Sequence, residues 1–294
     1  MKTVMITGAN SGLGFETAKK IAEDPTYAVI LACRNPEKAE QAEKEIVSAT
    51  GNENVSVVIL DTSDLTSVRN CVDDIRKKNI HLDALVCNAG ISPVHQGTTK
   101  DGYELVFATN YLGHYLLVME LLSSMNAYAR VINVTSDMHN PPQGIVWKGV
   151  DYLAYHAQDD RQRYSYSKLC NILFTYRLAD ELRKRNSTIC VNCFNPGYMS
   201  DTNFSGGHGG KAHSLMVKAT MPDRYGTLES SSEALTQLVT DESLTNVSGA
   251  YYDRSYGIGK SSELSHNPEV QNELWNRSQE YTGINAEEIL NHLL

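Results

Sequence analysis

Tyr164 and Lys168 are the residues of this sequence with the clearest chemical potential. They begin and end the stretch Tyr164-Ser165-Tyr166-Ser167-Lys168, which leads from a polar run into the apolar helical pattern Leu169 to Leu182. Residues four apart share one helix face, about 5–6 Å apart at Cβ, so Tyr164 and Lys168 should be neighbours and Tyr166 should point away. An ammonium beside a phenol favours the phenolate, and we therefore expect a lowered tyrosine pKa suited to acid–base chemistry. The pentapeptide alone fits an ordinary surface helix equally well.

A glycine-rich turn follows the first apolar strand pattern, Val4-Met5-Ile6, and precedes a helical pattern from Phe15 to Ala22. Glycine allows a tight turn and close backbone approach to a phosphate, and a helix N-terminus offers oriented N–H groups. The spacing is G-x-x-x-G-x-G, not the G-x-G-x-x-G fingerprint, and a tight strand-to-helix connection explains such a turn as well. The turn predicts a nucleotide-phosphate site made by Gly8, Asn10, Ser11, Gly12, Leu13 and Gly14.

The end of the second strand pattern, Tyr27 to Cys33, bears on which nucleotide would bind. An acidic residue about 20 positions after the glycines would bind the ribose hydroxyls of NAD, whereas a nearby arginine accommodates the 2′-phosphate of NADP. Here Cys33 is followed by Arg34, and Lys38 lies one turn into the helix predicted from Pro36 to about Thr50. We find no carboxylate in the sequence there to repel a phosphate. These residues favour NADP(H), although Arg34 could also be a solvated loop charge.

Strand and helix patterns alternate along the chain, which predicts a doubly wound parallel sheet (Rossmann-like) in three layers. We expect a single domain over residues 1–294, with a cofactor half of about 1–135 and catalytic and substrate elements over about 136–294. Ligands of such sheets bind beyond the carboxyl ends of the strands. The residues that follow the predicted strands at that edge are Arg34, Asp61, Thr62, Asn88, Ala89, Gly90, Ser136, Pro196 and Gly197. The further strands are predicted at Val55–Leu60, Ala84–Cys87, Val131–Thr135, Ile189–Phe194 and Gly249–Asp253, with helices at Thr99–Ala108 and Asn110–Leu122 among others.

Composition excludes several classes of function. The formal net charge is −9, which argues against nonspecific binding to nucleic acid or anionic membranes. No apolar run approaches the roughly 18 residues of a membrane span, and the N-terminal residues enter a strand pattern without signal-peptide features. The six cysteines lie in apolar patterns and show no disulfide framework. Cys190 and Cys193 fall in a strand and face opposite sides, so we expect no metal site, and we expect a cytoplasmic location.

Taken together, the motifs resemble the short-chain dehydrogenase/reductase family along nearly the whole chain. They stand in the expected order as Thr7-Gly8-x-x-x-Gly12-x-Gly14, Asp61, Asn88-Ala89-Gly90, Asn110, Ser136, Tyr164-x-x-x-Lys168 and Asn195-Pro196-Gly197. The resemblance implies an oxidoreductase in which Tyr164 is the general acid/base and Ser136 binds the substrate oxygen. It also implies that Lys168 lowers the pKa of Tyr164 and binds the nicotinamide ribose, and that Asn110, at the start of a helix, holds a water for proton resupply. Pro196 and Gly197 would lie against the nicotinamide.

Several segments resemble one branch of that family, which contains the retinol dehydrogenases, the WW-domain oxidoreductases and the light-dependent protochlorophyllide reductases. They are Ala32-Cys33-Arg34-Asn35, Asn110-Tyr-Leu-Gly-His114 and Ser167-Lys168-Leu169-Cys170-Asn171. The segment Pro196-Gly197-Tyr-Met-Ser-Asp-Thr202 resembles the protochlorophyllide reductases in particular. The interpretation favoured here is NADPH-dependent hydride transfer to or from an apolar or aromatic carbonyl or alcohol. The substrate pocket would be walled by residues 137–163 and 198–225. A light-dependent pigment reductase and a non-catalytic NADPH-binding interaction module are the alternatives, and homo-oligomers are common in this family.

Overall fold

The computed structural model describes residues 1–199, 204, 218–220 and 224–293. Parallel strands form one sheet of order β3-β2-β1-β4-β5-β6-β7 in this part of the chain. The strands are β1 (Lys2–Thr7), β2 (Tyr27–Cys33), β3 (Val55–Ile59), β4 (Leu82–Cys87), β5 (Met125–Val134), β6 (Cys190–Asn195) and β7 (Tyr251–Asp253). The direction of winding reverses between β1 and β4, and this is where doubly wound sheets form a ligand crevice.

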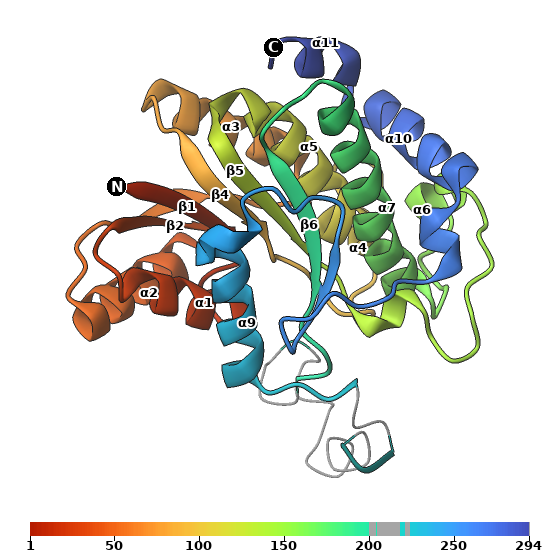
Figure 1. The fold of residues 1–294 in the computed structure, drawn as a ribbon. Coiled ribbons are helices and arrows are strands. Elements are labelled where there is room, and N and C mark those ends of the chain that lie inside the picture. Colours follow the sequence, from red (N-terminus) through yellow and green to blue (C-terminus); the bar gives the residue numbers. More distant parts are fainter. Residues whose placement is uncertain (200–203, 205–217, 221–223, 294) are drawn as a thin grey trace.

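Helices cover both faces of the sheet, which makes three layers (Figure 1). One face carries α1 (Gly12–Ala22), α2 (Pro36–Thr50) and α9 (Leu228–Thr240). The other face carries α3 (Leu65–Lys77), α5 (Gly113–Leu121) and α7 (Arg163–Lys184). Strand side chains alternate between the two cores: Val4 and Ile6 of β1 pack on the first face, and Met5 packs on the second. This alternation is the reason for the continuous apolar strand patterns.

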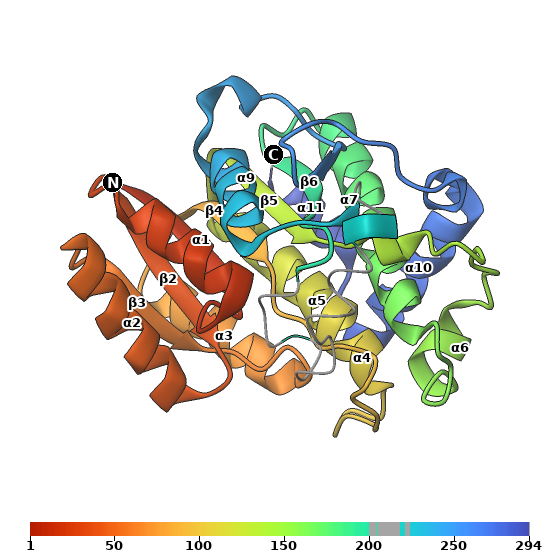
Figure 2. The same cartoon turned by 90° about the horizontal axis from the view of Figure 1, so that it is seen from below.

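The C-terminal helices lie outside α7, on the side away from the sheet. These are α10 (Pro268–Thr282) and α11 (Ala286–Asn291), and α10 also contacts the short helix α6 (Val150–Tyr155). The views in Figures 1 and 2 agree that α7 lies between β6 and α10. Leu274 and Trp275 of α10 belong to the same apolar core as α5 and α7.

The predicted helix Thr99–Ala108 is wrong. Gly102, at φ 89°, closes a turn there, and Thr98 pairs with Glu104 in an isolated antiparallel bridge. Helix α4 begins only at Leu105 and runs to Phe107, and a π-helical turn, Ala108–Leu112, joins it to α5. Asn110 therefore lies inside a continuous helical stretch and does not begin a helix. The predicted strand Val131–Thr135 also begins earlier, at Met125.

The expectation that no stretch has the length and apolar character of a membrane span also needs correction. By length and composition alone, Leu105–Ser124 passes this test. However, 89% of the tested stretch is buried inside the protein, between the sheet and the outer helices. A core helix of a folded domain has the same properties, so this stretch is explained by its packing.

Candidate active site at the carboxyl edge of the sheet

The glycine-rich turn packs directly on the turn that follows β4. A Cβ atom on Gly14 would lie 2.5 Å from Asn88 Nδ2 and 2.8 Å from the Gly8 oxygen, so no larger residue fits. Gly8, at φ +65°, is similarly close to Ala89. The Thr7 hydroxyl accepts hydrogen bonds from the backbone N–H groups of Asn88 (2.9 Å) and Ala89 (2.8 Å). The predicted neighbours are thus brought together, and their glycines leave room for close approach of a phosphate.

The N-terminus of α1 is open in a way that favours an anion. Ser11 occupies the N-cap position but makes no capping hydrogen bond, and the first turn contains no acidic residue. In contrast, α2 and α3 are capped by Asn35 and Asp64. Free N–H groups at a helix N-terminus, together with the helix dipole, favour a bound phosphate. The residues therefore fit the pyrophosphate of a dinucleotide.

Both acidic and basic side chains lie at the outer end of this site. Arg34 is largely exposed, and its Nε lies 4.0 Å from Asp61 Oδ2. Asp61 Oδ1 accepts from the backbone N–H (2.9 Å) and hydroxyl (2.6 Å) of Ser63. A hollow beside the glycine turn is lined by Asn10, Ser11, Glu37, Lys38, Gln41, Ala42 and Glu45. The sequence expectation of a region without carboxylates is therefore wrong, because folding places Asp61, Glu37 and Glu45 near the basic residues.

Tyr164, Lys168 and Ser136 come together where β5 and α7 meet. The Lys168 ammonium lies 5.6 Å from the centroid of the Tyr164 ring and donates to the Val134 oxygen at 3.0 Å. The Ser136 side chain, directly beyond β5, is close enough to the Tyr164 phenol to lower its pKa. Thr135 Oγ1 donates to the Lys168 backbone oxygen at 2.8 Å, which fastens the helix to the strand end.

Burial governs the protonation of this pair. Burial raises the pKa of Tyr164 to about 12, and the hydrogen bond from Ser136 only partly offsets the increase. Burial also lowers the pKa of Lys168 to about 8. Desolvation penalises each charged form, and no lowering of the Tyr164 pKa by Lys168 is seen. This corrects the expectation of a lowered tyrosine pKa and leaves Tyr164 a protonated acid at neutral pH.

The Asn110 side chain is occupied by protein contacts. Its Oδ1 accepts from the Ile91 N–H at 2.8 Å, and its Nδ2 donates to the Ile91 oxygen (3.1 Å) and to Ser167 Oγ (3.0 Å). A Cβ on Gly90 would lie 3.2 Å from Asn110 Oδ1 and 3.7 Å from Lys168 Nζ. Asn110 therefore joins the turn after β4 to α7, near Lys168. Its backbone oxygen contacts His114 Nδ1 at 3.2 Å, a link that the sequence did not indicate.

A reciprocal contact joins Asp137, the residue after Ser136, to the Asn195-Pro196-Gly197 turn. Asn195 Oδ1 accepts from the backbone N–H groups of Asp137 (3.0 Å) and Gly197 (3.0 Å), and Asn195 Nδ2 donates to Asp137 Oδ1 at 2.7 Å. The carboxylate of Asp137 also lies 3.7 Å from Arg254. Sequence reasoning missed Asp137 and Arg254, because only folding brings them to this turn.

Large hydrophobic side chains are exposed in the segments at this edge of the sheet, and one of them lies beside Tyr164. The Phe204 ring lies 5.6 Å from the Tyr164 ring, centroid to centroid. Val94, Met138, Val146 and Phe204 are exposed large hydrophobic residues in the segments that follow β4, β5 and β6. Most of the predicted pocket wall between 198 and 225 lies outside the described residues.

Comparisons with known proteins identify the family of this chain. A family model described as short chain dehydrogenase matches residues 2–147. Retinol dehydrogenase 13 of Mus musculus is 34% identical over 291 residues, covering 96% of this chain and 84% of its own length. The chain belongs to the short-chain dehydrogenase/reductase family. Within the family it falls in the retinol dehydrogenase branch, as the sequence motifs predicted.

Other relatives and structures extend the family assignment. Human polyprenol dehydrogenase is 31% identical over 304 residues (96% of this chain, 86% of that protein). Human WW domain-containing oxidoreductase is 39% identical over 215 residues, covering 69% of this chain and 50% of that protein. A crystal structure from Mycobacterium paratuberculosis superposes with a TM-score of 0.73 at 28% identity, covering 97% of this chain and 94% of that one. The Serratia marcescens short-chain dehydrogenase/reductase gives a TM-score of 0.66 at 23% identity over 86% of this chain and 95% of that one, which supports the fold.

Proposed function

We propose that this family member transfers hydride between NADPH and the carbonyl or alcohol group of an apolar or aromatic substrate, with Tyr164 as general acid/base. The observation that carries the proposal is the position of Tyr164. Its ring centroid lies 5.6 Å from the Lys168 ammonium, and the Ser136 side chain is close enough to affect its pKa, at the same edge of the sheet as the glycine turn. The nicotinamide would supply the hydride when bound.

The residues can each do one part of a carbonyl reduction. Ser136 Oγ accepts from the Met138 N–H at 3.2 Å, and its own proton can turn from Tyr164 to the substrate oxygen. Tyr164, protonated because burial raises its pKa to about 12, can give its proton to the same oxygen. Lys168 stays cationic below its pKa of about 8, with its ammonium 5.6 Å from the centroid of the Tyr164 ring. Positioned acid–base groups typically contribute about 10²–10⁴-fold in rate.

The substitution Tyr164→Phe tests the mechanism. It removes the proton donor and keeps the ring, so we expect carbonyl-dependent NADPH oxidation to fall at least about 10²-fold, while the dissociation constant of NADPH changes little. NADPH fluorescence and absorbance at steady state measure both quantities. Tyr128→Phe, at an exposed tyrosine far from this edge, is the matched control. Turnover by Tyr164→Phe at the wild-type rate would contradict the proposed role.

Preference for NADPH is proposed from the exposed Arg34 and from Lys38, which lines the hollow beside the glycine turn. An arginine here suits a 2′-phosphate, and pairing with Asp61 would hold the guanidinium near the site. Arg34→Asp would place a second carboxylate beside Asp61. We expect it to weaken NADPH binding about tenfold or more and to affect NADH much less.

A charge-matched control separates this local effect from the change in net charge. Lys44→Asp makes the same change on an exposed position of α2. Titration of both cofactors against wild type, Arg34→Asp and Lys44→Asp measures the preference. If wild type and Arg34→Asp bind each cofactor equally well, the assignment of NADPH is wrong.

The substrate class is proposed from the exposed apolar residues near Tyr164 and from the relatives. Retinol dehydrogenase 13 and polyprenol dehydrogenase are named for apolar alcohols, which supports carbonyl and alcohol chemistry over pigment reduction. The alternative of a pigment reductase would require light-dependent turnover of a porphyrin. The alternative of a non-catalytic module would require tight NADPH binding and no turnover of any aldehyde or ketone.

We also propose a cytoplasmic location. The six cysteines are free and buried, a state that suits a reducing compartment. Fractionation of cells that produce the native chain tests this proposal, and recovery with membranes would contradict it.

A further inference from the structure

Arg163 precedes Tyr164 and is buried at the start of α7. One of its terminal nitrogens donates to the Asp160 oxygen at 2.9 Å. The other donates to the Pro93 oxygen and lies 3.5 Å from the His95 oxygen. Its Nε lies 3.9 Å from Glu104 Oε1. These contacts join the segment after β4, the chain before α7 and the start of α4, and we call them the Arg163 clamp.

A buried cation at the start of α7 costs free energy, and the contacts of Arg163 must offset that cost. The dipole of α7 opposes a cation at its N-terminus, and desolvation opposes burial of both Arg163 and Glu104. Glu104 Oε2 accepts from the Phe107 N–H at 2.6 Å, whereas Glu104 Oε1 and Arg163 Nε have no hydrogen-bond partner among the described residues. Arg163 and Glu104 are therefore near each other without a hydrogen bond between them. The hydrogen bonds of Arg163 go to backbone carbonyl oxygens instead.

The carbonyls belong to a segment that borders the reactive residues. Residues 91–95 follow Gly90, which lies close to Lys168, and Ile91 is bonded to Asn110. Arg163 brings the other end of this segment to the residue beside Tyr164. Val94, 56% exposed, projects from it with no polar function. The segment thus runs from beside Lys168 to Arg163, the neighbour of Tyr164, and its position relative to Tyr164 depends on Arg163.

The first turn of α7 holds a second segment in the same manner. Gln162 Nε2 donates to the Gly144 oxygen at 2.8 Å, and the Tyr166 hydroxyl donates to the Val146 oxygen at 3.3 Å. Val146 is 75% exposed. The residues on either side of Tyr164 in the sequence therefore hold two segments that each carry an exposed valine, while Tyr164 itself remains available for chemistry.

We propose that Arg163 is a positioning residue that sets the substrate specificity of this site. By holding residues 91–95 against the start of α7, it fixes an apolar wall at the distance from Tyr164 that a bulky apolar carbonyl compound requires. A small aldehyde makes little contact with that wall and depends on it less. This inference rests on the proposed function.

The kinetic test compares a small and a bulky aldehyde, butanal and 2-naphthaldehyde, with NADPH as donor. Arg163→Met keeps the side-chain length and removes all donors. We expect it to raise KM for 2-naphthaldehyde about tenfold and KM for butanal less than about twofold, with kcat and NADPH affinity little changed. Arg163→Lys should be intermediate, because an ammonium is a single point donor and cannot span several carbonyls as a guanidinium does.

Hydrogen exchange of the amides of residues 91–97, read by mass spectrometry on the NADPH complex, is the second measurement. Arg163→Met should speed this exchange, and Arg163→Lys should restore part of the protection. Arg161→Met, at an exposed arginine two positions earlier, should match wild type in both measurements.

Equal changes of KM for the two aldehydes, or unchanged exchange of residues 91–97 in Arg163→Met, would overturn the proposal. If wild type turns over neither aldehyde, the proposed function has failed on this pair. The exchange measurement then still decides whether Arg163 holds the wall.

Discussion

His114 shows how folding can hold a buried histidine in one protonation state. Its Nε2 lies 2.9 Å from Thr7 Oγ1, and its Nδ1 lies 3.2 Å from the Asn110 oxygen. Thr7 Oγ1 already accepts N–H bonds from Asn88 and Ala89, so its own proton goes to His114 Nε2. The ring proton of His114 therefore sits on Nδ1 and is donated to Asn110. A second ring proton would find no acceptor at Nε2.

This state makes stability depend on pH. Burial lowers the pKa of His114 to about 4, whereas the unfolded chain has the ordinary value of about 6.5. Between these values the unfolded state binds more protons, so the free energy of unfolding falls as the pH is lowered through this window. The loss from His114 approaches about 3 kcal/mol. The pKa of His139 is also lowered by burial, which adds in the same direction. Urea unfolding at a series of pH values measures the slope.

The substitution His114→Gln isolates the contribution of this residue. Glutamine can accept from Thr7 and donate to Asn110 but does not titrate, so the loss of stability between about pH 6.5 and 4 should become smaller. His81→Gln, at an exposed histidine, should keep the wild-type slope. An unchanged slope in His114→Gln would show that His114 titrates normally in the folded protein.

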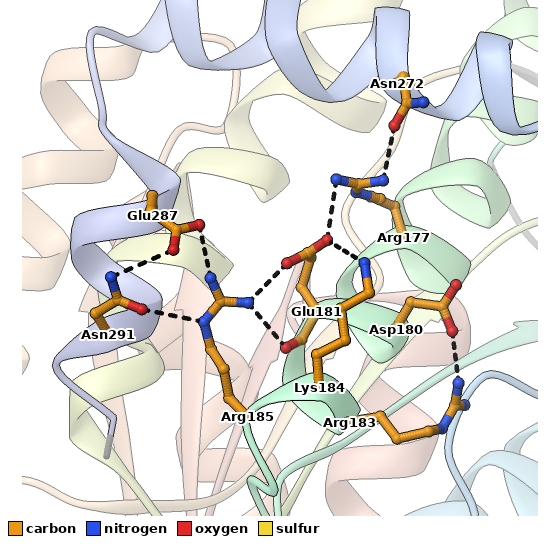
Figure 3. Close-up of polar contacts among 9 residues, drawn as sticks. All are labelled: Arg177, Asp180, Glu181, Arg183, Lys184, Arg185, Asn272, Glu287 and Asn291. Atoms are coloured by element: carbon orange, nitrogen blue, oxygen red, sulfur yellow. Dashed lines mark hydrogen bonds and ion pairs between the residues drawn. The ribbon is translucent and has the colours of Figure 1, made fainter.

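Among the secondary-structure elements, helix α7 has a different role at each of its two ends. Its first turn carries Tyr164 and the Arg163 clamp, and its last turns attach the C-terminal helices (Figure 3). There the buried carboxylate of Glu181 lies 2.9 Å from Arg177, 2.9 Å from Lys184 and 2.7 Å from Arg185. Arg185 also pairs with Glu287 of α11 at 2.6 Å. These contacts lower the pKa of Glu181 against the opposing effect of its burial.

The substitution Glu181→Gln should reduce stability without changing the chemistry. It removes the charge that three cations share, and we expect the free energy of unfolding to fall by about 1–3 kcal/mol with KM and kcat unchanged. Urea unfolding and steady-state kinetics measure these quantities. The wild-type stabilisation by Glu181 should be present above pH 4.5, the ordinary glutamate value, and should disappear as pH falls through its lowered pKa.

The neighbouring pair of Asp180 and Arg183 is the matched control in the same turn (Figure 3). Both side chains are more than half exposed, where ion pairs contribute about 0–1 kcal/mol. Asp180→Asn should therefore change stability less than Glu181→Gln. Equal losses of stability from the two substitutions would show that burial of Glu181 does not strengthen its ion pairs.

In the whole molecule, the C-terminal helices α10 and α11 cover the outer faces of α5 and α7. Trp275 of α10 packs against Phe174 of α7 at 6.2 Å and Tyr115 of α5 at 6.0 Å between ring centroids. Leu290 of α11 joins the same core. The apolar faces of α5 and α7 that turn away from the sheet are thus covered by the chain itself.

This coverage predicts a monomer. Helices α10 and α11 occupy the outer side of α5 and α7, where a partner subunit would otherwise pack. Light scattering coupled to gel filtration should give a mass near 32.6 kDa. A stable dimer whose interface includes α7 would contradict the prediction, because α10 would have to leave its place.

Much of the fold and of the candidate site was determined by the sequence alone. Glycine turns and alternating apolar patterns are local signals, and they placed most strands and helices within a few residues. The spacing of Tyr164 and Lys168 likewise placed both on one helix face. Where Gly102 interrupted a helical pattern, the local prediction was wrong, because its positive φ and the bridge from Thr98 to Glu104 override propensity.

Only the tertiary structure decided what surrounds these residues. The pKa of Tyr164 rises instead of falling, because desolvation depends on atoms that are distant in the sequence. Contacts between distant parts of the sequence also explain why the Asn110 amide donates to Ile91 and Ser167 and why Arg34 lies beside Asp61. Burial and pairing arise from contacts between separate elements. Residue types and spacing could therefore name the reactive groups of this protein, while their protonation and their supports were set by packing.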